Sequence, residues 1–467
     1  MAEQNYDKFP GRKRLLAVRD EAQHLAGILR GSLGANRKDE LAATIARQHP
    51  ADLADAMYFL TDEEDLIVFE ALSVAEAAEV LDEVDGTTRA SLAKSTSPGR
   101  LAAILAIMPP DEGVHVVAGL APDHVERVLA LVEGSVQHQI RKLYAYPQQS
   151  AGRIMSTGYV TVHPESSKAD AIHRFASLDG GEHLFFVYVI DQEGALAGTL
   201  DLRSLLKAPE ESTVGELMCR APFTVEPLID QEQVSNIFIR YDLTALPVVE
   251  PGTNRLLGVI TSEDIIEILQ EEGAEDVAHF TGTDADELEK KSPAQIAKLR
   301  IPWILATMFI ELLAGLVIHA FDQTLTKVIL LASFMPIISA ISGNTGLQSA
   351  AIIIRGLSTG HVDLVHWRHA VARQLGTTVI LGAVCGITLG AIGSIWDRSL
   401  GFGVVVTVGM FASVNIAGAV GTVIPLISKR MGFDPALTAG PFETAFQDVV
   451  GISIFLALAT AMLPLLH

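Results

Sequence analysis

Five apolar segments fill the chain from Ile301 onward, and they constrain its fold more than any other feature. Each is long enough to cross the roughly 30 Å hydrocarbon layer of a membrane as an α-helix that rises about 1.5 Å per residue. We therefore predict a five-helix transmembrane domain over residues 301–467. Its spans are predicted at 301–320, 328–354, 374–396, 404–427 and 440–464.

The last apolar segment carries two carboxylates, Glu443 near its start and Asp448 deeper. A carboxylate in the middle of a membrane helix is unfavourable by about 2.5–3.5 kcal/mol, so one that is kept there usually faces a water-filled path or a partner. Asp448 is therefore a candidate pore carboxylate. For Glu443 two interpretations stay open, a place at the pore or one at the interface, where its side chain reaches water. Glu311 adds a carboxylate to the first span.

The second apolar segment, FMPIISAISGNTGLQSAAIIIRG, contains residues that interrupt helices. We predict that Pro336 and a turn at Gly343 and Gly346 break this span and free backbone carbonyls, which must then face protein or a wet cavity. This predicts a pore wall that includes Gly343, Asn344 and Gly346. The side chains of Asn344 and Gln348 either support hydrated ions or hydrogen-bond across helices.

Basic residues lie mainly at one end of each predicted span. Because Lys and Arg near spans mark the cytoplasmic side, we predict a multi-pass protein of the cell (inner) membrane with its N-terminus in the cytoplasm and its C-terminus outside. The first residues, MAEQNYDKFPGRKRLL, lack the apolar core of a signal peptide, which agrees. The predicted cytoplasmic residues are Lys290, Lys291, Lys298, Arg300, Arg355, Arg368, Arg373, Lys429 and Arg430, against Lys327 and Arg398 outside.

The chain carries a formal net charge of −22, and nearly all of its charged residues precede the first span. Nucleic-acid binding needs clustered Lys and Arg, so this charge excludes a nucleic-acid partner and favours cations. Two cysteines, Cys219 and Cys385, are too few for a disulfide framework or a zinc site.

A helical domain is predicted over residues 39–146, after an N-terminal extension over 1–38. Apolar residues recur there at spacings of three and four between Pro, Gly and Asp breaks, which is typical of an all-α superhelix of stacked helices. Its acidic pairs, such as Asp82 and Asp85, are interpreted as solvated helix faces and caps.

Residues 147–270 contain an internal repeat, whose two copies begin RIMSTGYVTVHPESSKADAIHRFAS and ELMCRAPFTVEPLIDQEQVSNIFIRYD. Such a repeat indicates two copies of one α/β unit packed together. The copies, 154–206 and 217–269, resemble a tandem pair of CBS domains. CBS pairs generally sense ligands, often adenine nucleotides, so the resemblance makes ATP a possible ligand by analogy of fold.

An acidic connecting helix is predicted over residues 262–300. Carboxylates three and four positions apart on one helix repel one another by about 0.2–0.5 kcal/mol per pair when exposed. The helix is either a solvated linker or a surface bridged by a hard divalent cation, which would turn repulsion into attraction. Its first four turns carry Glu263, Asp264, Glu267, Glu271, Glu272, Glu275 and Asp276.

The whole chain from about Asp39 to Leu463 resembles the MgtE magnesium channels. The motifs that carry this resemblance are HPADLAD, AAEVL, YPQQSAGRIM, the CBS pair, AEDVAHF, FMPII, SGNTGLQS, IIIRGL, GFDPA and the GPF–D–G pattern of the last span. The resemblance implies a homodimer, not an enzyme, whose pore lies between two sets of five helices. Asp448 falls at the position that meets a hydrated Mg²⁺ ion, which gives up its water reluctantly.

The resemblance also implies a cytosolic Mg²⁺ sensor. In this family Mg²⁺ neutralises acidic faces between the helical domain, the CBS pair and the connecting (plug) helix, and so holds the pore shut. The sensor positions that are acidic in this chain are Glu79, Asp111, Asp230, Glu232, Asp242, Asp264, Glu267, Glu272, Glu275, Asp276 and Asp434.

Three departures from the family pattern stand out. His115 occupies the position of an expected sensor carboxylate, SGNTG replaces GGNTG, and Glu311 and Glu443 are additional carboxylates. An alternative function is therefore a divalent-cation carrier or exchanger for Co²⁺ or Mn²⁺, in which Glu311 and Glu443 relay protons or Na⁺. A third possibility, a nucleotide sensor tethered by its helices, does not explain why Asp448 and Asn344 lie in the membrane segments.

Overall fold

The computed structural model describes residues 18–34, 38–177, 185–220, 223–283, 293–362, 364 and 367–465. They form two compact units, one built mainly from the chain up to Leu269 and one from Gln270 onward. The beginning of the predicted N-terminal extension, up to residue 17, and residues 284–292 of the predicted connecting helix lie outside the described residues.

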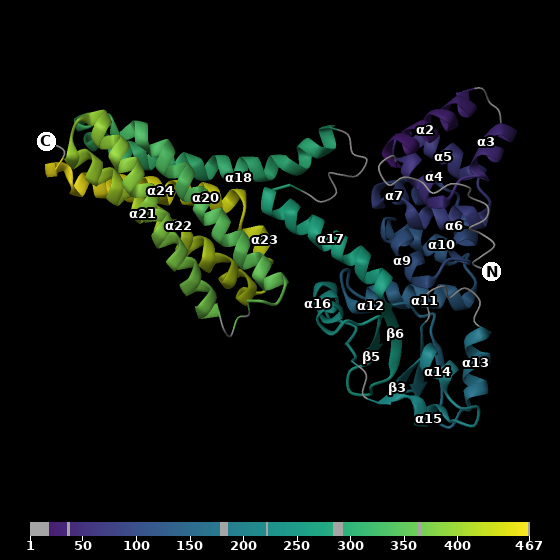
Figure 1. The fold of residues 1–467 in the computed structure, drawn as a ribbon. Coiled ribbons are helices and arrows are strands. Elements are labelled where there is room, and N and C mark those ends of the chain that lie inside the picture. Colours follow the sequence, from purple (N-terminus) through teal and green to yellow (C-terminus); the bar gives the residue numbers. More distant parts are fainter. Residues whose placement is uncertain are drawn as a thin grey trace. The chain divides into compact units, whose positions relative to one another are not determined.

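The first unit begins with a double row of short helices (Figure 1). Each helix packs against the next but one, so that the even-numbered helices form one row and the odd-numbered helices the other. This is the predicted superhelix, but it begins before residue 39, because the first helix lies in the predicted N-terminal extension and its Leu25 and Leu29 belong to the same core. Its helices are α2 (Val18–Gly34), α3 (Lys38–Ile45), α4 (Pro50–Met57), α5 (Asp62–Ala71), α6 (Val74–Glu83), α7 (Gly86–Ser95), α8 (Pro98–Leu105), α9 (Pro110–Ala118), α10 (Pro122–Leu129) and α11 (Gly134–Tyr144).

Many of these helices begin at a capping residue that can be recognised in the sequence. Thr61 and Ser73 each accept a hydrogen bond from the backbone of a glutamate three residues later, whose side chain bonds back to the cap, so both form capping boxes. Asp85 caps α7, as the sequence predicts. A cap of this kind contributes about 1 kcal/mol.

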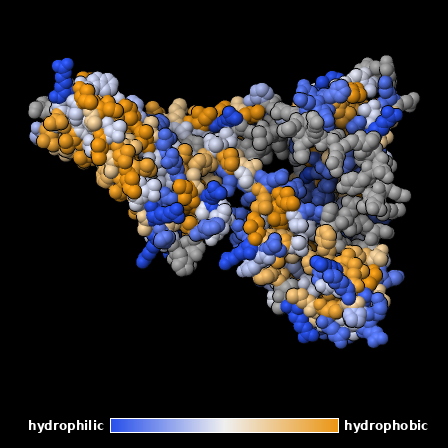
Figure 2. Space-filling view, viewed as in Figure 1, coloured by the Kyte–Doolittle hydropathy of each residue, from blue (hydrophilic) through white to orange (hydrophobic). Residues whose placement is uncertain are grey.

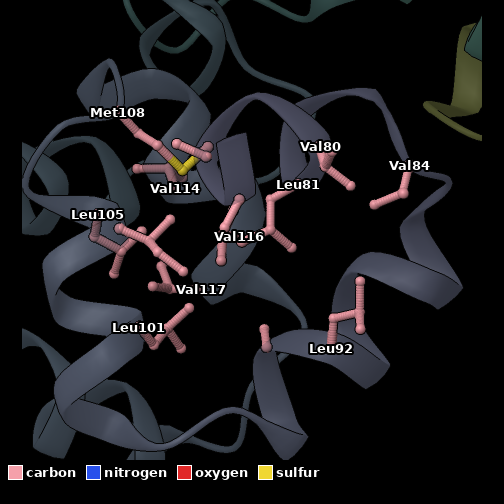
Figure 3. Close-up of a cluster of buried hydrophobic side chains, with 14 of the residues drawn as sticks. Val80, Leu81, Val84, Leu92, Leu101, Leu105, Met108, Val114, Val116 and Val117 are labelled. Atoms are coloured by element: carbon pink, nitrogen blue, oxygen red, sulfur yellow. The ribbon is translucent and has the colours of Figure 1, made fainter. Parts of the chain in front are cut away.

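The apolar faces of these helices meet in one continuous core. Figure 3 shows part of it, where Leu81, Leu105 and Val117 point toward one another from α6, α8 and α9, and all three are fully buried. The same core continues into the second CBS copy through Val234 and Phe238. The helical domain and that copy are therefore one block.

The two predicted CBS copies form two small sheets in which each copy contributes to the sheet of the other. The first sheet has the order β1-β2-β3-β4, and the second pairs β5 with β6. Strand β4 pairs with β3 of the first copy, and Ser156 forms a bridge to Val259 of β6. The elements are α12 (Ala151–Ile154), β1 (Val160–Val162), α13 (Lys168–Ala176), β2 (Phe186–Ile190), β3 (Leu196–Asp201), α14 (Leu202–Lys207), α15 (Val214–Leu217), β4 (Cys219–Arg220), α16 (Gln231–Tyr241), β5 (Ala245–Val249) and β6 (Leu256–Thr261).

The acidic helix α17 (Ser262–Thr281) follows directly, and its residues divide between the two units at Leu269. It ends earlier than the predicted connecting helix, and Gly282 after it has a φ of 71°. Residues 293–300, which were assigned to the connecting helix, are the beginning of α18.

Among its described residues, the second unit contains five helices that are long and apolar enough to cross a membrane, as predicted. Apolar side chains cover much of its visible face in Figure 2. Helices α20, α22 and α24 pack together, α21 packs on α22, and α18 packs on α24. The elements are α18 (Pro293–Ala320), α19 (Asp322–Lys327), α20 (Leu331–Ser358), α21 (Trp367–Asp397), α22 (Leu400–Met431), α23 (Pro435–Thr438), α24 (Pro441–Ala461) and a 3₁₀ turn at Leu463–Leu465.

The predicted break in the second span is wrong. Helix α20 is continuous and contains both Pro336 and the SGNTG sequence. Pro336 lies near the helix start, and Gly343 and Gly346 face α24, where their missing side chains make room for its polar groups. In a membrane an unbroken helix satisfies its own backbone, so these residues permit close packing and do not open a turn.

Candidate ion pathway and acidic contacts

Asp448 lies about two turns into α24 and is half-buried. Ser339 Oγ of α20 donates a hydrogen bond to Asp448 Oδ1 at 2.5 Å. The carboxyl of Glu311, from the exposed face of α18, lies close enough to the Asp448 carboxyl for the two to interact. We call Glu311, Ser339 and Asp448 the pore group, because three helices bring their oxygens together between apolar surfaces.

The pore group is suited to a cation. Two carboxyl groups in contact repel each other when both are charged, and a proton or a cation near them removes that repulsion. A Cβ atom at Gly343 would lie 3.5 Å from Asp448 Oδ1, so the glycine leaves that side of the carboxylate open. Asn344 and Gln348 lie on the exposed side of α20.

Glu443 is not interfacial. Its side chain is only 1% exposed, as is that of Gln447 one turn later. Both lie inside the helix bundle, where Glu443 Oε1 comes close to Gly346 and Gly421. The interpretation of Glu443 as a side chain that reaches water at the interface is therefore wrong, because α24 turns this residue toward α20 and α22.

A second group of carboxyls gathers in the first unit, where the start of α17 faces α6 and α9. We call Asp82, Asp111, Glu112, Asp264 and Glu267 the acidic contact. The carboxyl groups of Glu112 and Asp82 lie close enough to interact, and Glu267 acts electrostatically on Glu112. Asp264 accepts hydrogen bonds from the backbone N and Oγ1 of Thr261, at 2.7 and 2.9 Å.

Burial and repulsion between neighbours raise the pKa of several of these carboxyls. Burial raises the pKa of Asp111 to about 6 and the pKa of Asp264 to about 7, although hydrogen bonds to both carboxyls act in the opposite direction. Burial and the neighbouring Asp82 also raise the pKa of Glu112 strongly. Asp111 Oδ1 is buried and has no hydrogen-bond partner in the described part of the chain. The acidic contact is thus unfavourable when all of its members are charged.

We expect the stability of the full chain in detergent, without divalent cations, to fall as the pH rises from about 4 to about 7, by on the order of 2 kcal/mol. The folded protein holds protons on Asp111 and Asp264 in this range. The unfolded chain has already lost them, so raising the pH favours unfolding. Denaturant titrations at a series of pH values measure the effect, and Asp111→Asn should reduce the slope. A flat profile, or one unchanged in that variant, would contradict the assignment.

The end of α17 contacts the loop between α22 and α24 within the second unit. His279 Nδ1 lies 3.0 Å from Asp434 Oδ2, and His279 Nε2 lies 3.9 Å from Glu275 Oε1. Phe280 packs against buried Ala436 and Ala439. These contacts bring two predicted sensor residues, Glu275 and Asp434, to one histidine.

The remaining predicted sensor residues lie on separate elements. Asp230 caps α16, Glu232 lies in its first turn, and Asp242 ends it with a φ of 51°. Glu79 is exposed on α6, and Glu272 and Asp276 lie along α17. His115 is exposed on α9, one turn after Asp111. Among the described residues, no group of three or more His, Cys, Asp or Glu side chains is arranged to hold a metal ion.

Sequence reasoning missed Asp82 and Glu112. Asp82 was interpreted as part of a solvated face, and Glu112 follows Asp111 in the first turn of α9. The adjacent acids Asp111 and Glu112, which follow Pro109 and Pro110, were the available signal. Only the packing of α17 against the helical domain makes both residues part of one cluster.

Polar oxygens enclosed by membrane-length helices are typical of a protein that moves cations across a membrane. Three family models match the chain: a divalent cation transporter model (MgtE) over residues 335–458, the MgtE intracellular N domain over 48–149, and CBS domains over 151–211 and 214–271.

The magnesium transporter MgtE of Thermus thermophilus is 30% identical over 449 residues, which cover 94% of this chain and 99% of that protein. The magnesium transporter MgtE of Bacillus subtilis is 34% identical over 72% of this chain and 74% of its own length. A crystal structure of the cytosolic domain of the Mg²⁺ channel MgtE in complex with ATP matches 52% of this chain and 99% of its own, with 29% identity and a TM-score of 0.49.

The chain belongs to the MgtE family of magnesium transporters. It is a membrane protein with an intracellular N domain, and it is not an enzyme. The predicted family and fold class are confirmed.

Proposed function

We propose that the protein is a Mg²⁺-selective channel for magnesium uptake across the cytoplasmic membrane. The observation that carries the proposal is the Asp448 carboxyl, held by Ser339 within a bundle of apolar helices. In a homodimer two Asp448 side chains would face one ion. Mg²⁺ dehydrates reluctantly, so such a pair would hold the hydrated ion through its water shell.

Closure by cytosolic Mg²⁺ is the second part of the proposal. The acidic contact is unfavourable without a cation, because burial raises the pKa of Asp111 and Asp264 and the neighbouring carboxyls raise it further. A state that brings such carboxyls together gains stability when Mg²⁺ neutralises them, and the population shifts toward it in proportion to the difference in affinity. At the end of α17, His279 lies near Glu275 and Asp434. Through these contacts a change in the position of α17 would move the loop between α22 and α24, and so affect the membrane helices.

The basic residues beside the spans support a cytoplasmic N-terminus and an external C-terminus. The two CBS copies support nucleotide binding by analogy of fold, and ATP at this pair stays a prediction.

One observation favours a second candidate, a divalent-cation carrier or exchanger coupled to Na⁺ or protons. Glu311 contacts Asp448 and adds a second carboxyl to the pore group. Patch recordings from liposomes that contain the full chain, with a gradient of Mg²⁺ alone, separate the two functions. A channel passes a current that reverses at the Mg²⁺ equilibrium potential, whereas a dependence on a Na⁺ or pH gradient identifies an exchanger.

Glu311→Gln is expected to raise the Mg²⁺ concentration that half-saturates the current by about tenfold. The substitution removes one negative charge next to Asp448 and keeps a polar side chain. Half-saturation of the current measures the effect. Asp322→Asn, which neutralises an exposed carboxyl at the start of α19, is the matched control and should leave half-saturation unchanged. A Glu311→Gln channel that behaves like the control would place Glu311 outside the ion path.

A further inference from the structure

Glu443 and Gln447 form a buried polar pair on α24 that the pore group does not use. Both side chains are 1% exposed. Within the described chain, Glu443 Oε2 and Gln447 Oε1 have no hydrogen-bond partner. The one donor between them, Gln447 Nε2, bonds to Ala417 O at 3.0 Å and to Glu443 Oε1 at 3.4 Å. Two acceptor oxygens are therefore enclosed without a donor.

Two glycines bring backbone oxygen to the same place. A Cβ atom at Gly346 would lie 3.0 Å from Glu443 Oε1, and one at Gly421 would lie 2.7 Å from that oxygen and would collide with the Gly346 carbonyl oxygen. The carboxylate of Glu443 and the carbonyl of Gly346 thus lie close together. Helices α20, α22 and α24 surround these oxygens together with the amide nitrogen of Gln447, which would lie 3.1 Å from the same Cβ atom at Gly346.

The described residues supply little compensation for a charge on Glu443. None of the ion pairs among them involves this residue. The N-terminus of α24 contributes about half of a positive charge, in the turn that carries Glu443. An unpaired carboxylate in such a place costs several kcal/mol, and buried charges are normally paired or bound to a metal.

We propose that these oxygens bind one desolvated monovalent cation of the size and hardness of Na⁺. The ligands are the carboxylate of Glu443, Oε1 of Gln447 and the carbonyl oxygen of Gly346. A single carboxylate balances one positive charge, whereas Mg²⁺ would leave an excess charge and would resist losing its water. Carbonyl and carboxylate oxygens inside membrane proteins are typical ligands of Na⁺.

This site is distinct from the pore group. Glu443 precedes Asp448 by five residues, which corresponds to about 140° around the helix. Asp448 contacts Ser339 and Glu311, while Glu443 contacts Gly346 and Gly421. The bound cation would join α24 to α20 and α22, and the proposal does not depend on the ion that the pore conducts.

Binding of ²²Na⁺ to the purified full chain in detergent tests the proposal. We expect one Na⁺ per chain, with Glu443→Gln weakening the affinity by about tenfold or more and Gln447→Leu by a smaller factor. The melting temperature of the wild-type chain should be higher in NaCl than in choline chloride at equal ionic strength, and this difference should disappear in Glu443→Gln. Asp448→Ala is the matched control and should keep both the binding and the melting shift.

Absence of Na⁺ binding by the wild-type chain, together with equal melting in the two salts, would overturn the proposal and leave a protonated Glu443 as the explanation. Binding that survives in both Glu443→Gln and Gln447→Leu would also overturn it, since the ion would lie elsewhere. If Glu443→Gln does not fold, Gln447→Leu alone decides. Normal Mg²⁺ conduction without Na⁺ binding would refute this site and leave the proposed function intact.

Discussion

Asp448→Ala is expected to abolish Mg²⁺ uptake, with a fall of at least about a hundredfold, which corresponds to about 2.7 kcal/mol. The variant loses the carboxylate that accepts the hydrogen bond from Ser339 and that would grip the hydration shell of the ion. Flux into liposomes, followed with a Mg²⁺-sensitive dye, measures the loss. Asp448→Asn keeps the shape and the hydrogen bond and should fail nearly as completely, because the charge is missing.

The Asp448→Ala protein should still fold. Replacing a carboxylate in a membrane helix by alanine removes an unfavourable contribution of about 2.5–3.5 kcal/mol, so the variant should melt no lower than the wild type. Asp397→Asn, at the exposed end of α21, is the control for a general effect of charge and should transport normally. Substantial Mg²⁺ flux through folded Asp448→Ala would refute the pore role of this residue.

Neutralising Glu275 and Asp276 together is expected to move closure to higher cytosolic Mg²⁺, by about three- to tenfold. Both carboxylates lie near the end of α17, where Glu275 reaches His279 and His279 contacts Asp434. Without these charges, each bound cation lowers the free energy of the closed state by less. A higher Mg²⁺ concentration is therefore needed to close the same fraction of channels. Open probability in patches at stepped cytosolic Mg²⁺ gives the midpoint of closure.

Glu271→Gln serves as the comparison for the double variant Glu275→Gln/Asp276→Asn, because it removes an exposed charge earlier on the same helix. It should leave the midpoint within about twofold of the wild type. A midpoint that is equally unchanged in the double variant would mean that this part of α17 is a solvated face and not part of a sensor.

The fold was largely predictable because its signals are local. Long apolar segments specify membrane helices, and the capping residues Thr61 and Ser73 begin helices where the spacing requires it. Helix α20 is the exception. Pro336 and the SGNTG sequence break helices in water, but in a bilayer a broken helix leaves backbone groups unsatisfied, and the glycines are used for contact with α24.

The candidate site was predictable only in part, since sequence shows which residues are unusual but not which way they point. Asp448 and Glu311 were both marked by their charge, and only the packing of α18 on α24 reveals that they touch. Glu443 was marked in the same way, yet its burial depends on Gly346 and Gly421, which lie on two other helices. Spacing along one helix contains no information of that kind.

The hydrophobic core that the helical domain shares with the second CBS copy has a consequence for cutting the chain. Phe238 and Val234 of that copy are part of the same core as Leu81 and Leu105. The first copy contributes Ile154 and Met155 to this core, but most of it packs in a core of its own around Val187. A shortened protein that begins after Tyr146 would therefore expose apolar surface mainly on the second CBS copy. Limited proteolysis should accordingly leave the helical domain and the second copy associated with each other through this core.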